Sequence, residues 1–350
     1  MCWPAAREND PLSIPVTNPF GVLADTKMPF LARALDPVEV QIELAKNCPT
    51  LGGDFGRLEV LSIQVVRYKP EQRCLIEYRL SAPRLPAGSL VILGKVRGRG
   101  LDKKAFRLVQ TLWRGEFGPQ SFDEIRVPEP LGTIPPFQMW LQSKVPGSTA
   151  TALLAKPEGV SLAKRIAEAI HKLHKGNLPA QRSHGMDDEL RILHERLALV
   201  AQSKPEWGKR LEKVLAACRR LGASVAKARE TGIHRDFYPA QVVVDGTNLY
   251  LLDLDWFSRG DPALDIGNFA GHLTEQSLRS YGNPLALADR EMALIERFAE
   301  LSPEVPLTSV QAYATLTLVR HIYLSTQFPE RNALTSSLLS LCEERLTGLI

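Results

Sequence analysis

The chain has 350 residues, of which 44% are hydrophobic and 23% are charged, and this ordinary globular composition excludes extended disorder. Its length allows two lobes that each bury a core of their own. The 43 Lys and Arg residues against 39 Asp and Glu residues give a net charge of +4, which is too small to indicate nucleic-acid binding but suits an anionic ligand such as a nucleotide.

The cysteines and the chain's hydropathy indicate a cellular compartment. Five widely spaced cysteines, an odd number with no C-x-x-C pair, indicate neither a disulfide framework nor a zinc site. The start of the chain has no basic region followed by an apolar run, and no stretch of about 18 apolar residues occurs anywhere. We therefore expect a cytoplasmic protein with neither a membrane nor a nucleic acid as partner.

The first quarter of the chain predicts an extension, a helix and then strands. Residues 1–35 are rich in Pro and have no period, so they predict an extension that packs on the body or stays mobile. Asp36-Pro37 predicts the cap and first turn of a helix that reaches about Asn47 and is closed by Gly52-Gly53.

Strand patterns follow this helix. Apolar and polar residues alternate in a predicted hairpin at 58–69 and 73–80, and the third apolar run, 90–96, contains a single charged residue, Lys95. A helix is predicted at about 101–113, and the apolar run 137–142 predicts an edge strand.

The second half is mainly helical by its apolar spacing. The predicted helices cover about 161–176, 187–202, 205–229, 263–281, 284–301, 309–327 and 330–348. His171 and His174 stand three residues apart on the first of these helices, without a third ligand of the right type nearby, so we interpret them as packing or surface residues.

Residues 231–268 contain the candidate catalytic and metal-binding carboxylates. Two short apolar runs, 242–244 and 249–252, flank Asp245-Gly246, a dipeptide that favours a tight hairpin turn and would bring Asp236 and Asp253 together. Two neighbouring carboxylates repel each other unless a cation or a shared proton lies between them. Their polar surroundings favour Mg²⁺, which usually completes its shell with phosphate oxygens, so the pattern indicates phosphoryl transfer.

The spacing of these residues is typical of kinases. His234-Arg235-Asp236 followed by Gln241 reads H-R-D-x-x-x-x-Q, and Asp253 lies 253 − 241 = 12 residues later. Residues 261–265 then read D-P-A-L-D. This segment resembles the aminoglycoside phosphotransferase and choline-kinase-like small-molecule kinases, whose pattern is H-G-D-x-x-x-x-N, a hairpin, I-D-x-x and D-P-x-x-D.

The resemblance implies an α+β, bilobal, protein-kinase-like fold. Residues 1–35 would be an N-terminal extension, 36–142 an N-lobe with a small antiparallel sheet, and 143–350 a mainly helical C-lobe. The implied activity moves the γ-phosphate of ATP or GTP to a hydroxyl of a sugar, an aminoglycoside or an amino alcohol. Only residues 256–260 separate the two acidic motifs and no A-P-E follows, so a peptide-docking segment has no room and the acceptor should be small.

The resemblance also implies roles for single residues. Asp236 would be the catalytic residue and Lys95 would contact the nucleotide's phosphates, whereas Asp253 and Gln241 would hold Mg²⁺. His234 would support the site structurally.

The remaining motif residues have supporting parts. Asp265 would anchor the backbone near His234 and Arg235. Arg235 stands where the family commonly has Gly, and we expect it to pair with an acid. Asp255 and Asp261 are further candidates for the site.

Three departures from the family or protein-kinase pattern favour an alternative. The first turn has no glycine-rich loop, Gln241 replaces Asn, and the helix at 101–113 has no Glu to pair with Lys95, with Asp102 as a possible substitute. The alternative is a catalytically impaired, nucleotide-binding regulatory protein.

Four residues of the late helices could touch substrate, although none is assigned; these are His272, Glu275, Arg320 and His321.

Overall fold

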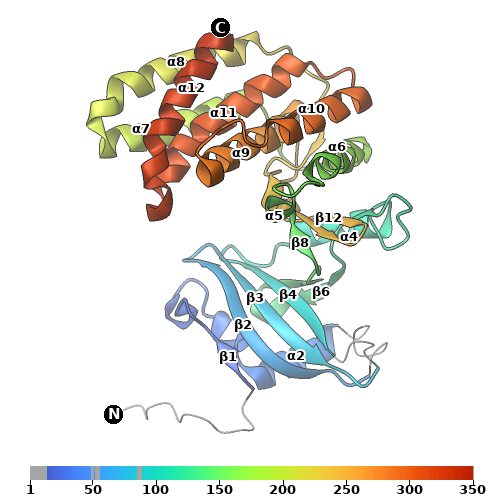
Figure 1. The fold of residues 1–350 in the computed structure, drawn as a ribbon. Coiled ribbons are helices and arrows are strands. Elements are labelled where there is room, and N and C mark those ends of the chain that lie inside the picture. Colours follow the sequence, from blue (N-terminus) through green and yellow to red (C-terminus); the bar gives the residue numbers. More distant parts are fainter. Residues whose placement is uncertain (1–13, 49–50, 52–55, 85–88, 350) are drawn as a thin grey trace. The chain divides into compact units, whose positions relative to one another are not determined.

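The computed structural model describes residues 14–48, 51, 56–84 and 89–349. Contacts divide the chain into two compact units, Met1–Val145 and Pro146–Ile350 (Figure 1). The predicted helix end at Gly52-Gly53 and the first part of the predicted extension, residues 1–13, lie outside the described residues. Every helix in the described ranges is too short or too polar to span a lipid bilayer.

The N-terminal unit is built on a six-stranded sheet in the order β1-β2-β3-β4-β7-β6. Its strands are β1 (Val16–Thr17), β2 (Glu59–Lys69), β3 (Arg73–Ser81), β4 (Leu90–Arg97), β6 (Pro130–Ile134) and β7 (Met139–Ser143). The short β1 runs parallel to β2, and all other neighbours are antiparallel. The hairpin and the third strand that the sequence predicted are confirmed.

The prediction of an edge strand at 137–142 is wrong. β7 lies between β4 and β6, so both of its sides are paired. Its residues from Met139 to Gln142 are all buried, which is the pattern of an interior strand covered on both faces. β6, which begins with Pro130, takes the edge position instead, where a missing N–H is tolerated.

One face of this sheet packs on helix α2 (Pro37–Asn47), whose first turn is capped as predicted. The Asp36 carboxylate accepts the N–H groups of Val38 and Glu39 at 2.9 and 3.0 Å. Residues 14–35 also pack here, because Met28 and Leu31 belong to the same core and are fully buried. This part of the predicted extension therefore packs on the body.

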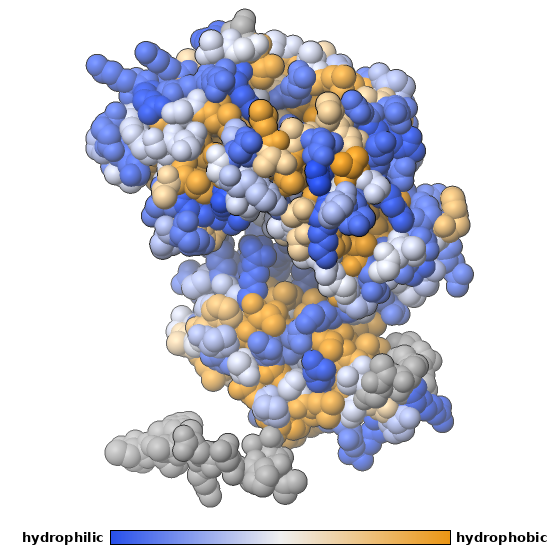
Figure 2. Space-filling view, in the orientation of Figure 1, coloured by the Kyte–Doolittle hydropathy of each residue, from blue (hydrophilic) through white to orange (hydrophobic). Residues whose placement is uncertain are grey.

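Alternation along the strands separates this core from the other sheet face. On β3 and β4 the core residues, such as Ile76 and Ile92, are fully buried, whereas Leu75, Leu93 and Lys95 on the opposite face are partly exposed. Figure 2 shows apolar side chains gathered over the strands of this unit, with polar side chains between them.

The C-terminal unit is mainly helical. Its helices are α5 (Ala150–Leu153), α6 (Gly159–Lys175), α7 (Met186–Ser203), α8 (Gly208–Ser224), α9 (Ala263–Tyr281), α10 (Ala288–Leu301), α11 (Leu307–Thr326) and α12 (Thr335–Leu349). α9 and α11 lie side by side (Figure 1) and are mostly buried. They approach closely at Gly267 and Gly271, where a Cβ atom would lie 2.5 Å from the Tyr313 Cβ and 2.7 Å from the Ala314 carbonyl oxygen. The α+β class, an antiparallel sheet followed by a mainly helical region, is confirmed.

Short strands connect the helices where the sequence carries its motifs. β10 (Thr231–Ile233) pairs with β13 (Ser258–Gly260), which also pairs with β9 (Ser183–His184). β11 (Val242–Asp245) and β12 (Asn248–Leu251) form the predicted hairpin, in which Asp245 faces Asn248. Gly246 has a φ of 58° in the turn, a conformation that favours glycine.

Candidate active site

The H-R-D motif forms a loop between β10 and a 3-10 turn at Pro239–Gln241, and two hydrogen bonds tie this loop to the end of the hairpin. The fully buried His234 donates from Nε2 to the Leu252 carbonyl at 2.8 Å. The Leu252 N–H in turn donates to the Gln241 carbonyl at 2.8 Å. Asp253 directly follows Leu252, and Asp236 lies two residues after His234; both aspartates are half-buried. The hairpin therefore returns the chain to the loop that carries Asp236.

Asp265 holds the start of this loop from the first turn of α9. Its carboxylate accepts the N–H of His234 at 2.8 Å and the N–H of Arg235 at 2.7 Å. The family resemblance implied that Asp265 would anchor the backbone near these same two residues. His174 Nε2 lies 2.9 Å from the same carboxylate, which is fully buried. His171, three residues before His174 on the same helix, has a different partner and hydrogen-bonds Ser302 at 2.8 Å.

Two further α9 residues hold the middle of the loop, and the sequence analysis missed the role of both. Asn268 Nδ2 donates to the Phe237 carbonyl at 2.8 Å. The His272 ring stacks on Tyr238 with 4.7 Å between centroids and 19° between planes. Asp265, Asn268 and His272 are spaced three and four residues apart, so they share one helix face. Polar residues at helical spacing on an otherwise buried helix were the signal that could have identified them.

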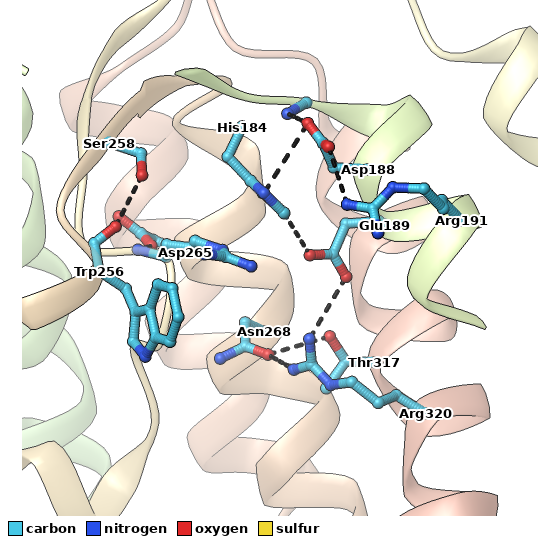
Figure 3. Close-up of polar contacts among 12 residues, drawn as sticks. His184, Asp188, Glu189, Arg191, Trp256, Ser258, Asp265, Asn268, Thr317 and Arg320 are labelled. Carbon is cyan, nitrogen blue, oxygen red and sulfur yellow. Dashed lines mark hydrogen bonds and ion pairs between the residues drawn. The ribbon is translucent and has the colours of Figure 1, made fainter. Parts of the chain in front are cut away.

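A buried polar chain extends from Asn268 to α11 and α7 (Figure 3). Asn268 Oδ1 accepts hydrogen bonds from Thr317 Oγ1 at 3.2 Å and from Arg320 Nη2. Arg320 Nη1 lies 3.3 Å from Glu189, whose other oxygen lies 2.6 Å from His184 Nε2. Burial favours the neutral form of Glu189, but the His184 hydrogen bond and the Arg320 charge outweigh it and lower the Glu189 pKa. The H-R-D loop is therefore supported by an ion-paired network.

The four late-helix residues that could have touched substrate lie within this helical packing. Arg320 is in the network just described, and His272 supports Tyr238. Glu275, which is 4% exposed, pairs with Arg279 at 2.9 Å. The buried His321 meets the His272 ring edge-on at 4.5 Å. Their observed contacts are structural.

Arg235 does not pair directly with an acid, so that expectation is wrong for the described residues. Its guanidinium lies 4.6 Å from the centroid of the Trp256 ring, and Arg182 lies 5.5 Å from the same centroid. Burial lowers the Arg235 pKa, and the more distant charge of Glu189 opposes this effect. Its φ of 70° explains why Gly is common at this position in the family pattern.

Lys95 lies in the N-terminal unit on the partly exposed face of β4. Its neighbours across the sheet are Leu75 and Trp140, and its Nζ lies 5.1 Å from the centroid of the Trp140 ring. Asp102, the possible partner of Lys95, has a different contact. It caps helix α4 (Lys103–Arg114) by accepting the Ala105 N–H at 3.0 Å.

The acidic residues after the hairpin differ in backbone and burial. Asp253 has φ 55° and ψ 52°, a left-handed conformation that is uncommon outside glycine and is enriched at functional sites. Asp261 accepts the Ala263 N–H at 2.9 Å at the start of α9, and burial raises its pKa. Within the described ranges, no three His, Cys, Asp or Glu residues are grouped closely enough to form a metal site. Gln241 is 6% exposed, and its backbone carbonyl accepts the Leu252 N–H.

Comparisons with solved structures show a similar fold. Choline kinase from Cryptosporidium parvum Iowa II superposes with a TM-score of 0.60 and 12% identity, covering 90% of this chain and 96% of that one. A choline/ethanolamine kinase family protein from Mesorhizobium loti gives 0.57 and 13%, covering 88% and 94%. A thermostable mutant of aminoglycoside phosphotransferase APH(4)-Ia, in complex with ADP and hygromycin B, gives 0.54 and 13%, covering 86% and 97%.

A search of curated proteins found no significant match. The model of the phosphotransferase enzyme family matches residues 113–308, from the last turn of α4 to the first turn of α11. This match covers more than half of the 350 residues and includes the H-R-D loop, the hairpin and the D-P-A-L-D motif. The chain therefore belongs to the phosphotransferase enzyme family.

Proposed function

We propose that this protein transfers the γ-phosphate of ATP or GTP to a hydroxyl of a small molecule. The observation that carries the proposal is the attachment of the catalytic loop to α9. Asp265 holds the backbone before Asp236, and Asn268 and His272 hold the groups after it. Phosphoryl transfer depends on positioning and charge stabilisation more than on covalent chemistry, so a carboxylate on a rigidly held loop suits it.

In this proposal Asp236 acts on the acceptor. Its carboxylate orients the hydroxyl and accepts its proton while the hydroxyl oxygen bonds to the γ-phosphorus. The bond between that phosphorus and the bridging oxygen breaks, and the nucleoside diphosphate leaves. Lys95 contacts the phosphates of the bound nucleotide.

The donors present fit a magnesium ion. Asp253 and Gln241 supply a carboxylate and an amide oxygen, which are the hard ligands that Mg²⁺ prefers. Because the described residues contain no complete protein metal site, the remaining ligands would be phosphate oxygens and water, as is usual for this ion. When bound, the ion would neutralise charge on the phosphates.

The acceptor in this proposal is small. Only a 3-10 turn (Leu254–Trp256) and the short β13 separate Asp253 from the D-P-A-L-D motif, which leaves no segment for docking a peptide. The similar solved structures include a glucosamine kinase and an ethanolamine kinase, whose names state hydroxylated small molecules. The aminoglycoside phosphotransferase complexes contain ADP with hygromycin B, or AMP-PNP with hygromycin B. These relatives support a nucleotide and a hydroxylated acceptor.

The test is acceptor-dependent turnover. The full-length protein is incubated with Mg²⁺, ATP or GTP, and a panel containing choline, ethanolamine, glucosamine and hygromycin B, and phosphorylated products are measured by mass spectrometry. We expect a product with at least one acceptor. Asp236→Asn should abolish it while nucleotide affinity stays close to that of the parent, because Asp236 acts on the acceptor and not on the nucleotide.

Two controls make the result decisive. Asp187→Asn changes an exposed aspartate on α7 and should leave turnover unchanged. Asp253→Ala should weaken nucleotide binding in the presence of Mg²⁺ more than in its absence. Nucleotide binding without any product across the panel would favour the catalytically impaired alternative. Absence of nucleotide binding would overturn both.

A further inference from the structure

Two arginines converge on the ring of Trp256, next to Asp236 in the chain. The guanidinium carbon of Arg235 lies 4.6 Å from the ring centroid, and that of Arg182 lies 5.5 Å from it. The two cations are therefore no farther apart than the sum of these distances. Trp256 is 40% exposed, and Arg182 is also exposed, so a molecule in solution can reach this group.

The sheet β10-β13-β9 brings these three residues to one of its ends. The last residue of β10 faces the first residue of β13, so Arg235, which follows β10, lies at the same end as Trp256, which precedes β13. β9 runs parallel to β13, and Arg182, which precedes β9, lies at that end too. Ser258 Oγ donates to the Trp256 carbonyl at 2.7 Å, and the Arg259 N–H donates to the Arg182 carbonyl at 2.7 Å. Regular pairing and these bonds hold the backbone of the group in place.

The two arginines lack a counter-charge in direct contact. Within the described ranges, the side chains of Arg235 and Arg182 form neither a hydrogen bond nor an ion pair. Glu189 is already engaged, since Figure 3 shows its carboxylate between His184 at 2.6 Å and Arg320 at 3.3 Å. Two neighbouring cations repel each other, and both keep their N–H donors available for a ligand.

Arg235 occupies its place at an energetic cost. Its φ of 70° is a strained conformation for any residue other than glycine. Its side chain is also half-buried, and a partly buried cation without an ion pair is unfavourable. Strained and electrostatically unfavourable residues are concentrated at functional sites. A negative group on a ligand would offset the electrostatic part of this cost.

The chemistry of the group specifies that ligand. The planar fork of an arginine donates two parallel hydrogen bonds to a carboxylate or a phosphate. The negative charges of Glu189 and Asp236 also act on the Arg235 guanidinium. A singly charged carboxylate therefore suits this site better than a doubly charged phosphate. Because Asp236 directly follows Arg235, the carboxylate would belong to the molecule whose hydroxyl meets Asp236.

We propose that Arg235 and Arg182 bind a carboxylate of the acceptor, so that the preferred acceptor is a small hydroxylated carboxylic acid. The inference rests on the proposed transfer reaction and narrows its acceptor. The carboxylate is bound and does not react, while the hydroxyl oxygen forms the new bond to phosphorus and the nucleoside diphosphate leaves. Amines such as ethanolamine are weaker substrates, because the two arginines repel them.

The test compares acceptors that differ by one group. D-Glycerate is paired with glycerol and D-glucuronate with D-glucose, so that in each pair a carboxylate replaces a CH₂OH group. With the parent protein, Mg²⁺ and ATP or GTP, we expect kcat/KM to be about tenfold or more higher for each acid, the effect of one charge-assisted hydrogen bond. Glycerol 3-phosphate should react less efficiently than D-glycerate, and the reverse order would overturn the choice of a carboxylate.

Four variants test the assignment to these arginines. Arg235→Gln and Arg182→Gln should each reduce the preference for the acid over its neutral partner about tenfold. Arg235→Lys keeps the charge but loses the fork, so its preference should be intermediate. Arg259→Gln is the matched control, because Arg259 is an exposed arginine of the same sheet that already pairs with Glu230 at 3.5 Å, and it should keep the parent preference.

Binding measurements separate this inference from the transfer reaction. The affinity of the parent protein for the four matched compounds is measured by calorimetry with and without ADP and Mg²⁺, where γ-phosphate is absent. Acids that bind no more tightly than their neutral partners would overturn the inference. An unchanged preference in Arg182→Gln would also overturn it, even if Arg235→Gln failed to fold. Tight binding of the acids without product would instead refute the transfer reaction and retain the carboxylate site.

Discussion

The Asp265 carboxylate accepts the backbone N–H of Arg235 at 2.7 Å and thereby fixes a residue whose φ is 70°. The backbone of a residue other than glycine is strained in this conformation, so surrounding contacts must hold it. The same fully buried carboxylate accepts the N–H of His234. Asp236 follows directly, so the direction of its side chain depends on a backbone held by one buried charge.

Asp265→Asn should therefore impair both folding and turnover. The amide keeps the shape of the carboxylate but removes its charge, and its NH₂ group would face one of the backbone donors. Loss of these charge-assisted hydrogen bonds should reduce the free energy of unfolding by about 3 kcal/mol, measured by urea denaturation. Under folding conditions kcat should fall more than nucleotide affinity.

The matched control is Asp188→Asn. Asp188 is a partly exposed aspartate that also accepts a backbone N–H, from Gly185 at 3.2 Å. Its replacement should cost less than about 1 kcal/mol, because solvent can satisfy the donors there. Equal stability and kcat in Asp265→Asn and the parent would contradict the anchoring role.

Strain at Arg235 can be measured by comparing Arg235→Gly with Arg235→Ala. Both variants remove the stacking of the guanidinium on Trp256, but only alanine retains a Cβ atom in the left-handed conformation. The glycine variant should be more stable than the alanine variant by about 1 kcal/mol in urea denaturation. A glycine variant that is less stable than the alanine variant would show that this backbone conformation is relaxed.

Local signals in the sequence were sufficient for the motif-bearing elements. α9 has the predicted bounds, Ala263–Tyr281, because Pro262 precedes its first turn and Gly282, with a φ of 67°, follows its last. The β11–β12 hairpin follows from its apolar runs and the glycine between them. In contrast, α10 begins at Ala288 and not at Pro284, since the Asn283 side chain accepts the Leu285 N–H at 2.9 Å and forms a turn first.

Non-local contacts limited the rest of the prediction. The place of β7 inside the sheet depends on pairing with β6, which its own residues do not specify. Glu189 and Arg320 are 131 positions apart, and their ion pair exists only because α7 and α11 pack together. The role of Asn268 likewise depends on which face of α9 meets the H-R-D loop, which becomes visible only in the folded chain.

Asn268→Asp tests whether the Asn268 side chain positions the loop that carries Asp236. The carboxylate can still accept from Arg320 and Thr317, but it cannot donate to the Phe237 carbonyl, which the parent side chain contacts at 2.8 Å. We expect kcat to fall about tenfold, equivalent to about 1.4 kcal/mol. The free energy of unfolding should also fall, by about 1 to 3 kcal/mol, because the buried Phe237 carbonyl loses its donor.

Thr317→Val is the matched control for this variant. It removes only the 3.2 Å hydrogen bond to Asn268 Oδ1 and should reduce stability by about 1 kcal/mol while kcat stays unchanged. The positioning role of Asn268 would be refuted if both variants lowered kcat equally.

Acid should destabilise the C-terminal unit through His321. Burial lowers the pKa of His321 to about 3, and the positive charges of Arg320, Arg331 and Arg279 contribute. In the unfolded chain the pKa is about 6.5. Between these two values the unfolded chain binds a proton that the folded chain excludes, so the free energy of unfolding decreases as the pH falls, by about 1.4 kcal/mol per pH unit for one group. Above pH 6.5 this stability is fully present.

His321→Phe removes the titration and keeps an aromatic ring against His272. Between about pH 6 and pH 4, the slope of the unfolding free energy against pH should become shallower than in the parent. The difference should be at most the slope that corresponds to uptake of one proton on unfolding. His194→Phe, at an exposed position on α7, should keep the parent slope. If His321→Phe and the parent share one slope, His321 is protonated equally in the folded and unfolded chains, and acid acts on the fold through other groups.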